Sequence, residues 1–593
     1  MAATTAGVEV LPRPGLQVAG GRRWSWGVFL LALVAMLALY HHMWANPAQR
    51  TLGSANHTND PMQMMWFLEW VPRAVLHGHN PFHTNAIFYP EGVSLTWNTF
   101  VPTLGILAAP VTLTLGAAVG FACLMTLGPP LTALTGFWWL RRHTERPAAA
   151  AVGALLLAFN PFVVGHMLGH LNLVFLALIP LILMLAEDLL WRRPRPMART
   201  AIYLGLTAAA QLGISEEVLL IVIIEAALGL AVAMFVMPGR TGQALVASWR
   251  GIALAIGVFL AVSAPLLISQ LFLARPLIVP TQRFRAVPGD YLYSLHRQWL
   301  VPSGRHHSYL GGAEGGVYLG WAVIAILVVG VALTLRDRRV RVMAAVLAVS
   351  VLLTFGTNGL DLDWLPWRLL AKVPAVESIL PSRFALGSFL VIAWLIAQWL
   401  DRLLAAAPGH DGRASPSPAR AVRRAAALAV VGALVLTFLP RPVGATRLPA
   451  HVAFFGSATE RSLLAEGSPI LLLPAPWFGD ASGMYYQQLD DFRFSVPTGY
   501  ALTSDTGNDS RAQLLRRFVI RAQTGGGEPV GPAVSVADAR AAAHAIGLRA
   551  VVVVLNSPTA AQSMALATSL TQRPADLIGD EVAIWRLTPA QQR

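Results

Sequence analysis

The sequence is poor in charge. Only 12% of its 593 residues are Asp, Glu, Lys or Arg, whereas about 25% is usual in soluble globular domains. It contains a single lysine, Lys372, and a single cysteine, Cys123, which lies inside an apolar run. One cysteine excludes an intrachain disulfide framework and a thiolate metal site. The shortage of charge excludes an ordinary soluble protein.

Apolar residues fill the chain instead. Hydrophobic residues make up 55% of the sequence, and the mean hydropathy is +0.56. A membrane-spanning helix needs about 20 apolar residues to cross about 30 Å of hydrocarbon. We therefore predict a polytopic α-helical membrane protein, with room in the chain for one further domain.

Eleven apolar stretches predict about eleven transmembrane helices. They lie near residues 24–43, 118–140, 148–164, 171–190, 200–213, 218–236, 251–274, 317–335, 342–356, 384–400 and 425–440. A secretory signal peptide at the first stretch is the alternative, but its apolar region would be shorter and a cleavage site of small residues would follow. The first helix is therefore expected to remain in the protein.

Clusters of arginine predict the orientation of these helices. They follow the second, fourth, eighth and tenth stretches, at 141–146, 192–199, 336–341 and 420–424. The positive-inside rule places such clusters in the cytoplasm. The N-terminal tail 1–23 is then cytoplasmic, residues 24–443 form the transmembrane domain, and residues 444–593 lie outside the cytoplasm. These clusters also account for the net charge of +14, so no nucleic-acid partner is expected.

Residues 101–115 are apolar but are not counted as a span. They contain Pro102 and Pro110, and a span here would invert the location of every later arginine cluster. We predict a re-entrant or interfacial segment with non-helical backbone. Because such backbone is tolerated at membrane depth only in protein or beside water, an aqueous cavity is expected near the first outer loop.

The first outer loop, residues 44–117, carries the strongest chemical signal. Its polar part from about Ala45 to Thr99 is rich in Asn, His, Trp and Tyr and is too long for a simple connector. Asp60 precedes Pro61, a favoured helix start, and Gln63 follows at helical spacing while Glu69 points elsewhere. Asp60 is either an N-cap or a carboxylate that serves as general base or metal ligand for a hydroxyl nucleophile.

Aromatic residues surround this acid in the sequence. Trp66, Trp70, Tyr89 and Trp97 all belong to the loop. Such rings commonly form a belt at the membrane interface, and they are equally suited to stacking on the faces of sugars. Both interpretations remain open, and Trp97 is taken as a candidate substrate contact.

These features resemble a known superfamily. The segments NDPMQMMWFLEW, NPFHTNAIFYPEGVSLTWNT, FNPFVVGHMLGHLN and ILPSRF, together with an acid-bearing first outer loop, many spans and an extracytoplasmic tail, resemble the GT-C membrane glycosyltransferases. Within that superfamily they are similar to actinobacterial multispanning proteins of the YfhO type. The resemblance covers most of the chain.

The resemblance implies a function and a base. A GT-C enzyme transfers a sugar from a polyprenyl-phosphate donor to an acceptor on the outer face, here a glycan or glycolipid, with the acid of the first loop as base. That role falls on Asp60. Many GT-C enzymes carry two adjacent acids at this point, whereas here the neighbour is Asn59. A divalent metal ion is thus an open question, with Glu69 as the other candidate ligand.

Further polar residues fall at the predicted outer ends of the spans. His166 and His170 are four residues apart, a spacing that places two rings on one helix face. They are either structural or substrate-contacting residues, or zinc ligands, although two ligands are too few to predict a site. Glu216 and Glu217 lie at the membrane boundary, where an acid is either functional or simply solvated.

Arginines of the outer face are candidates for binding the donor phosphate. The loop 275–316 contains five arginines, and a guanidinium group suits a phosphate. Arg283 or Arg285 is the first candidate, followed by Arg383 of the PSRF segment. Long loops are translocated largely regardless of charge, so the arginines of this loop also have a purely structural explanation.

The tail from 444 changes character. SPILLLPAP, RAVVVVL and EVAIWRL each predict a strand, and DARAAAHAIGL predicts an amphipathic helix. We expect a small α/β domain for acceptor binding, capping or structural support, in which the run from Tyr485 to Gln488 could recognise sugar.

The sequence thus predicts a multi-pass glycosyltransferase of the plasma (inner) membrane, in contact with membrane lipid, a polyprenyl-phosphate sugar and a cell-envelope acceptor. The alternatives are a flippase or transporter of lipid-linked sugars, and a non-enzymatic envelope assembly protein.

Overall fold

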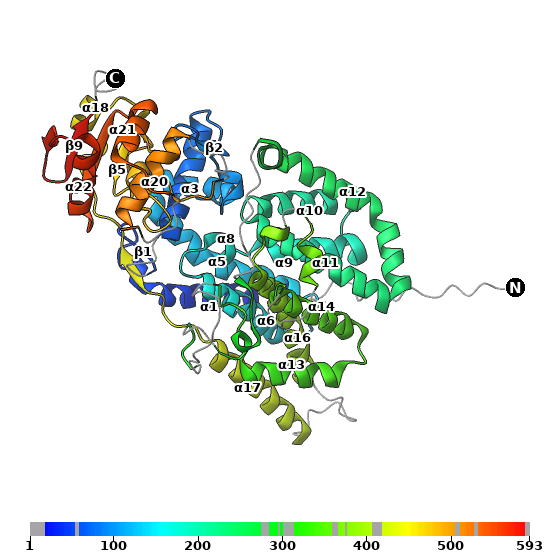
Figure 1. Ribbon diagram of the computed structural model, residues 1–593. Helices are drawn as coiled ribbons and strands as arrows, with labels where there is room; N and C mark the ends of the chain where they lie inside the picture. The colour runs from blue at the N-terminus through cyan, green and yellow to red at the C-terminus, as the bar shows by residue number, and fades with distance from the viewer. Residues whose placement is uncertain are drawn as a thin grey trace.

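A helical bundle joined to a smaller α/β domain makes up the molecule (Figure 1). The computed structural model describes residues 18–53, 59–273, 284–293, 297–300, 314–357, 366–373, 376–405, 418–503, 510–526 and 532–587. The helices of the bundle, in chain order, are α1 (Val18–Leu39), α4 (Pro102–Leu115), α5 (Ala117–Leu140), α6 (Pro147–Phe159), α9 (Leu178–Glu187), α10 (Met197–Leu212), α11 (Glu216–Val236), α12 (Pro238–Ile268), α13 (Gly320–Thr334), α14 (Arg338–Thr354), α16 (Ala385–Leu403) and α17 (Pro418–Phe438).

Eight helical stretches among the described residues are long and apolar enough to cross a membrane. They are Gly21–Leu39, Ala117–Leu140, Pro147–His166, Leu171–Arg192, Glu216–Val236, Pro238–Phe272, Pro381–Leu403 and Arg420–Phe438. The chain is therefore a multi-pass membrane protein, as predicted. The predicted spans at 200–213, 317–335 and 342–356 correspond to α10, α13 and α14, which have 16, 15 and 17 residues. The total of eleven spans stays a prediction.

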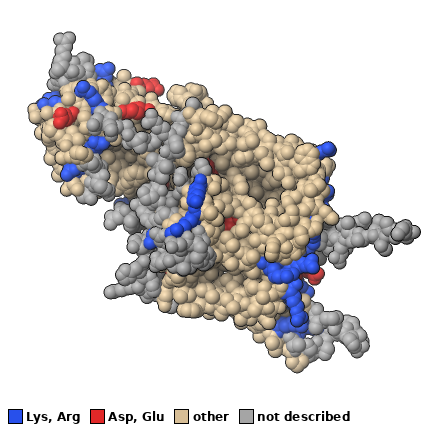
Figure 2. All heavy atoms as spheres, turned by 45° about the vertical axis from the view of Figure 1, so that its right-hand side comes forward, with Lys and Arg blue, Asp and Glu red and all other residues tan. Residues whose placement is uncertain are grey.

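The outer surface of the bundle suits a lipid environment. Large apolar side chains point away from the protein, with Phe235 89% exposed and Leu333 79% exposed. Figure 2 shows few charged side chains over the middle of the bundle and more of them on the α/β domain and toward the opposite end. Hydrocarbon can cover such a surface at no cost, whereas water cannot.

Residues 101–115 do not have the predicted non-helical backbone. They form α4, a continuous helix of 14 residues between Val101 and Gly116. Pro102 occupies the first turn, where a missing N–H costs nothing, and the helix continues through Pro110. At about 1.5 Å per residue, α4 is about 21 Å long, which is too short to cross the hydrocarbon. It packs between α5 and α3 (Asn59–Leu76).

The C-terminal region contains the predicted strands and helix. A five-stranded mixed sheet has the order β6-β5-β7-β9-β8, in which β5 is parallel to β6 and β7 while β9 is antiparallel to β7 and β8. Its strands are β5 (Ser468–Leu473), β6 (Phe494–Ser495), β7 (Ala550–Val554), β8 (Leu577–Ile578) and β9 (Val582–Arg586), and its helices are α18 (Ala458–Leu463), α19 (Ser482–Leu489), α20 (Arg511–Gln523), α21 (Val536–Ala545) and α22 (Ala560–Thr571).

The two faces of this sheet are both buried. Alternate residues of β5 and β7 point to opposite sides: Leu471 and Val551 pack with α20, α21 and α22, whereas Leu472 and Val552 join the large core that includes α19 and α3. A sheet buried on both faces explains why β7 reads as an unbroken run of valines.

The α/β domain docks on the first outer loop. Helix α19 packs against α3, and the Trp66 indole donates a hydrogen bond of 2.9 Å to Gln487. The Gln487 amide in turn donates to the carbonyl oxygens of Ala86 and Phe494, at 2.7 and 2.8 Å. These bonds tie residues more than 400 positions apart into one unit.

A second set of contacts holds the loop at the other end of the interface. The Arg516 guanidinium pairs with Glu91 at 2.6 Å, donates to the Phe88 carbonyl at 2.9 Å and lies 5.3 Å from the centre of the Phe88 ring. At the membrane side, strand β1 (Arg50–Leu52) pairs antiparallel with β4 (Ala445–Arg447). The connection between the two parts of the chain is therefore itself fixed to the loop.

This docking generates a stability prediction. Arg516→Ala would leave Glu91 and the Pro497 carbonyl without their donor, so we expect the folded protein to lose about 1–3 kcal/mol. The measurement is chemical or thermal unfolding of the detergent-solubilised protein. Arg511→Ala, at the exposed start of the same helix, is the matched control. Equal stability of the two variants would contradict the role of Arg516.

Candidate active site

Asp60 lies in the first turn of α3, and its carboxylate faces two other parts of the chain. The Tyr500 hydroxyl donates a hydrogen bond to Oδ1, and His170 Nε2 lies 3.3 Å from Oδ2. The Asp60 side chain is 38% exposed. Among the described residues no backbone N–H of α3 donates to it, and the helix already begins at Asn59. Asp60 is thus not the N-cap that the sequence left open.

His170 reaches Asp60 because of a tight turn. The helix α7 (Pro161–His166) is capped by Asn160, whose side chain accepts from the Val163 N–H at 3.2 Å. Gly169 follows with a φ of +146°, and a Cβ at this position would lie 2.6 Å from Pro61 Cγ. Glycine therefore permits the close approach of this turn to the start of α3.

Burial controls the protonation of His170. It lowers the pKa of the imidazole to about 4, against the opposite influence of Asp60. The ring is therefore neutral near pH 7. In this form its Nε2 lies beside the Asp60 carboxylate without adding a positive charge.

His166 connects this pair to a second, buried cluster. Its ring centroid lies 5.3 Å from that of His170, with the two planes nearly perpendicular. His166 Nδ1 is 2.7 Å from the Phe162 carbonyl oxygen, and Nε2 is 3.5 Å from Glu314. The spacing predicted that the two histidines share one helix, but α7 ends at His166. Their rings are nevertheless in contact.

Arg383 is the centre of the buried cluster. Its guanidinium binds Glu314 with distances of 2.6 and 3.2 Å and also pairs with Glu217. Burial opposes ionisation of Glu314, but Arg383 and His166 outweigh it and hold its pKa well below the usual value. The Arg383 donors are engaged by two carboxylates, so its predicted role on the donor phosphate stays a prediction. No pattern in the sequence pointed to Glu314.

Gln63 also belongs to the site. Its amide donates to the Tyr500 carbonyl at 2.6 Å and accepts from the Thr99 hydroxyl at 3.3 Å. Gly499, beside Tyr500, would place a Cβ 2.7 Å from the Phe88 ring, so the strand-to-loop segment that carries Tyr500 lies directly on the first outer loop. Tyr500 had no predicted role, because it is 440 residues from Asp60.

The structure places other predicted residues outside this cluster. Trp97 donates to the Gln270 carbonyl at 3.1 Å, and the Gln270 amide donates to Glu216 at 2.5 Å. Arg285 precedes Ala286, whose N–H bonds to the Thr354 carbonyl at the end of α14. Arg283 lies outside the described residues.

Glu69 does not join Asp60. Nine residues along α3 correspond to about 13 Å at 1.5 Å per residue. Glu69 is instead near Arg73 and Asp491, and burial raises its pKa to about 7. Asn59 is also engaged elsewhere, since it accepts from the Ala481 N–H at 3.1 Å and donates to the Phe478 carbonyl at 3.0 Å.

These positions bear on the metal question. Among the described residues, no three His, Cys, Asp or Glu side chains converge as metal ligands. With Glu69 more than two helical turns away and Asn59 bound to the α/β domain, the residues around Asp60 do not fit a two-carboxylate metal site.

The fold resembles that of known membrane enzymes. No protein-family model matches the sequence, and no curated protein matches it. The cryo-EM structure of the arabinofuranosyltransferase AftD from Mycobacteria matches 95% of this chain with a TM-score of 0.52 and 15% identity. The protein has the GT-C fold. The chain spans 41% of the AftD length, and at this identity the likeness concerns the fold alone.

A second solved structure also matches most of the chain. ArnT from Cupriavidus metallidurans, bound to undecaprenyl phosphate, matches 95% of this chain and 97% of ArnT, with a TM-score of 0.45 and 12% identity. The apo state of ArnT matches with a TM-score of 0.44 and 13% identity.

Two predicted sugar-stacking surfaces are buried in this GT-C structure. Trp66 and Trp70 stack at 5.5 Å and pack against Phe492 of the α/β domain. Tyr485 and Tyr486 of α19 are buried as well. Because the docking of the α/β domain covers these rings, the structure fits neither a belt nor a sugar platform at Trp66 and Trp70, nor a sugar contact at Tyr485 and Tyr486.

The buried cluster generates a second stability prediction. Arg383→Ala would leave Glu217 and Glu314 without their cation, and breaking a buried pair in this way costs about 3–5 kcal/mol. Replacing both acids by Gln in the Arg383→Ala background should recover part of that loss. Chemical unfolding in detergent measures both effects.

The control lies at the other end of the helical stretch Pro381–Leu403 that begins beside Arg383. Arg402 pairs with Asp337 at the exposed end of α16, and such surface pairs contribute about 1 kcal/mol or less. A loss in Arg383→Ala no larger than that in Arg402→Ala would contradict the role of the buried cluster.

Proposed function

We propose that this protein is a membrane glycosyltransferase that transfers a sugar from a polyprenyl-phosphate donor to a hydroxyl of a cell-envelope acceptor. The observation that carries the proposal is the partly exposed Asp60 carboxylate, held by Tyr500 and His170 at the mouth of a GT-C fold. Asp60 is accessible to a substrate hydroxyl, and its neighbours restrict its orientation. A general base requires both properties.

The chemistry is an inverting displacement at the anomeric carbon. The acceptor oxygen attacks that carbon while its proton passes to Asp60, a new glycosidic C–O bond forms, and the bond to the phosphate oxygen breaks. The electron pair of the broken bond leaves with the polyprenyl phosphate. The base must lie within hydrogen-bond reach of the acceptor hydroxyl, and fixing it there supplies much of the rate gain through orientation.

Three residues position the base rather than react. Tyr500 donates to Asp60 from the α/β domain, neutral His170 lies beside the other carboxylate oxygen, and Gln63 holds the Tyr500 backbone. On this proposal the α/β domain completes the active site. The arginines Arg283 and Arg285 remain our candidates for the leaving phosphate, since a guanidinium group stabilises the charge that develops there.

We assign the site to the extracytoplasmic face. Asp60, Glu217 and Arg383 cluster at one end of the bundle, near the starts of α3, α11 and α16. The arginine cluster 141–146 follows the end of α5, and the cluster 336–341 lies at the start of α14. We place both at the opposite end of the bundle. Under the positive-inside rule those ends face the cytoplasm, so the α/β domain and Asp60 face outward.

The proposal predicts how replacing the Asp60 carboxylate by an amide changes the turnover of the enzyme. Asp60→Asn keeps the size of the side chain and a carbonyl oxygen for the Tyr500 hydroxyl, but it cannot accept the acceptor proton. We expect turnover of the cognate polyprenyl-phosphate sugar to fall about 10²-fold to 10⁴-fold, which is the usual contribution of a general base. The measurement is donor consumption by purified protein in vesicles, with a panel of donors and acceptors.

Asp580→Asn, which changes an exposed acid of the α/β domain, is the matched control and should turn over donor like the wild type. Both variants should unfold at the wild-type denaturant concentration. Wild-type turnover by a folded Asp60→Asn protein would exclude Asp60 as base. Protein-dependent movement of the lipid-linked sugar across the vesicle membrane, without its consumption, would support a flippase instead.

A further inference from the structure

A cavity lies at the end of the bundle opposite to Asp60. Helix α11 starts with Glu216 and Glu217 near the active site, and its 21 residues extend about 30 Å. The cavity is lined by residues of α11 from Val222 to Ala233, by Met237 after its end, and by parts of α9, α14 and α16. It therefore does not belong to the candidate active site.

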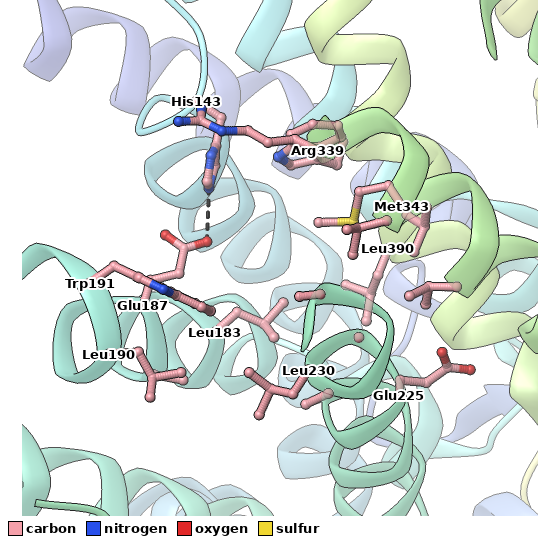
Figure 3. Close-up of a pocket in the computed structure, with 18 of the residues that line it drawn as sticks. His143, Leu183, Glu187, Leu190, Trp191, Glu225, Leu230, Arg339, Met343 and Leu390 are labelled. Atoms are coloured by element: carbon pink, nitrogen blue, oxygen red, sulfur yellow. Dashed lines mark hydrogen bonds and ion pairs between the residues drawn. The ribbon is translucent and has the colours of Figure 1, made fainter. Parts of the chain in front are cut away.

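The cavity is large and apolar. Its volume is about 340 Å³, within the range of sites for small molecules. Figure 3 shows Leu183, Leu190, Leu230, Leu390 and Met343 directed toward one space between the helices. A sugar or a nucleotide would leave its polar groups unsatisfied against such a lining, whereas a hydrocarbon chain would fill it.

The carboxyl group of Glu225, the acid at the inner end of the cavity, points toward α14 and not into the cavity. Glu225 Oε2 accepts a hydrogen bond of 2.7 Å from Ser350 of α14. Gly387 of α16 makes room for this carboxyl group, because a Cβ there would lie 2.4 Å from Glu225 Oε1. Figure 3 shows Glu225 at the edge of the group of apolar side chains. The carboxyl group thus packs between α14 and α16.

The mouth of the cavity carries an excess of cations. The Glu187 carboxylate lies 2.8 Å from His143 Nε2 and 3.6 Å from Arg192 Nε. Arg240, at the start of α12, and Arg339, at the start of α14, also border the cavity and are exposed. Within the part of the chain that the structure describes, neither has an acidic side chain within 4.0 Å. Two guanidinium groups are thus available beside an apolar space.

We propose that this cavity binds one acyl chain of an anionic membrane phospholipid, whose phosphate lies between Arg240 and Arg339. Apolar burial of the chain supplies the affinity, and the pair of guanidinium groups selects a negatively charged head group. Basic pockets between membrane helices bind anionic lipids by the same physical combination. The site is separate from the proposed donor site, so it would hold a lipid whether or not sugar transfer occurs.

The test uses delipidated, full-length protein in detergent, titrated with phosphatidylglycerol or phosphatidylcholine and observed by native mass spectrometry. We expect one tightly retained phosphatidylglycerol and at least tenfold weaker retention of phosphatidylcholine. Gly229→Phe should weaken phosphatidylglycerol binding at least tenfold, because Gly229 lines the cavity and a Cβ there meets only Val346 Cγ2, at 3.8 Å. The new ring can therefore enter the cavity without a backbone clash.

Gly257→Phe is the matched control, since Gly257 lies on the exposed side of α12 with nothing within 4 Å of a Cβ. It should bind phosphatidylglycerol like the wild type. The surface variant Arg240→Glu/Arg339→Glu tests the head group without touching the packing, and it should abolish the preference for phosphatidylglycerol. Unchanged binding by either the Gly229 or the arginine variant would overturn the proposal. The proposal would also be overturned if undecaprenyl phosphate displaced phosphatidylglycerol when present at a lower concentration than phosphatidylglycerol.

Discussion

The packing of α19 against α3 is the contact on which the rest of the molecule depends. It buries Trp66 and Trp70 against Phe492, and it brings Gln487 to the indole of Trp66. The same docking sets Tyr500 against Asp60. An outer loop without this partner would expose a stack of aromatic rings to water, at a cost of several kcal/mol. The α/β domain therefore stabilises the loop and contributes a side chain to the site within it.

The bundle separates two kinds of chemistry along its helices. One end gathers Asp60, the two histidines and the Glu314–Arg383–Glu217 cluster, where charges are paired because burial of a lone charge is unfavourable. The other end holds an apolar cavity edged by arginines. The long helix α11 connects the two ends.

Sequence patterns predicted the parts of this protein that depend on local order. Apolar runs predicted the long helices and the strands β5, β7 and β9, and the Asp60-Pro61 pair predicted the start of α3 within two residues. The contact of His166 with His170 arises from the turn after α7 and not from the shared helix that their spacing predicted. The roles of Tyr500 and Glu314 could not be predicted, because each reaches its partner from a distant segment. The helical form of α4 was missed because Pro110 was expected to interrupt the helix, whereas α4 continues through this exposed residue.

The central claim is that Tyr500 and His170 act through Asp60 as one unit, and a kinetic double-mutant cycle tests it most directly. Turnover of the donor is measured for Tyr500→Phe, His170→Ala and the double variant. Unfolding of each variant is measured beside it, to check that the protein is folded under the assay conditions. Residues that position one base should be strongly non-additive. We expect the double variant to be close in rate to the slower single variant. A double variant whose loss equals the product of the two single losses would contradict the account.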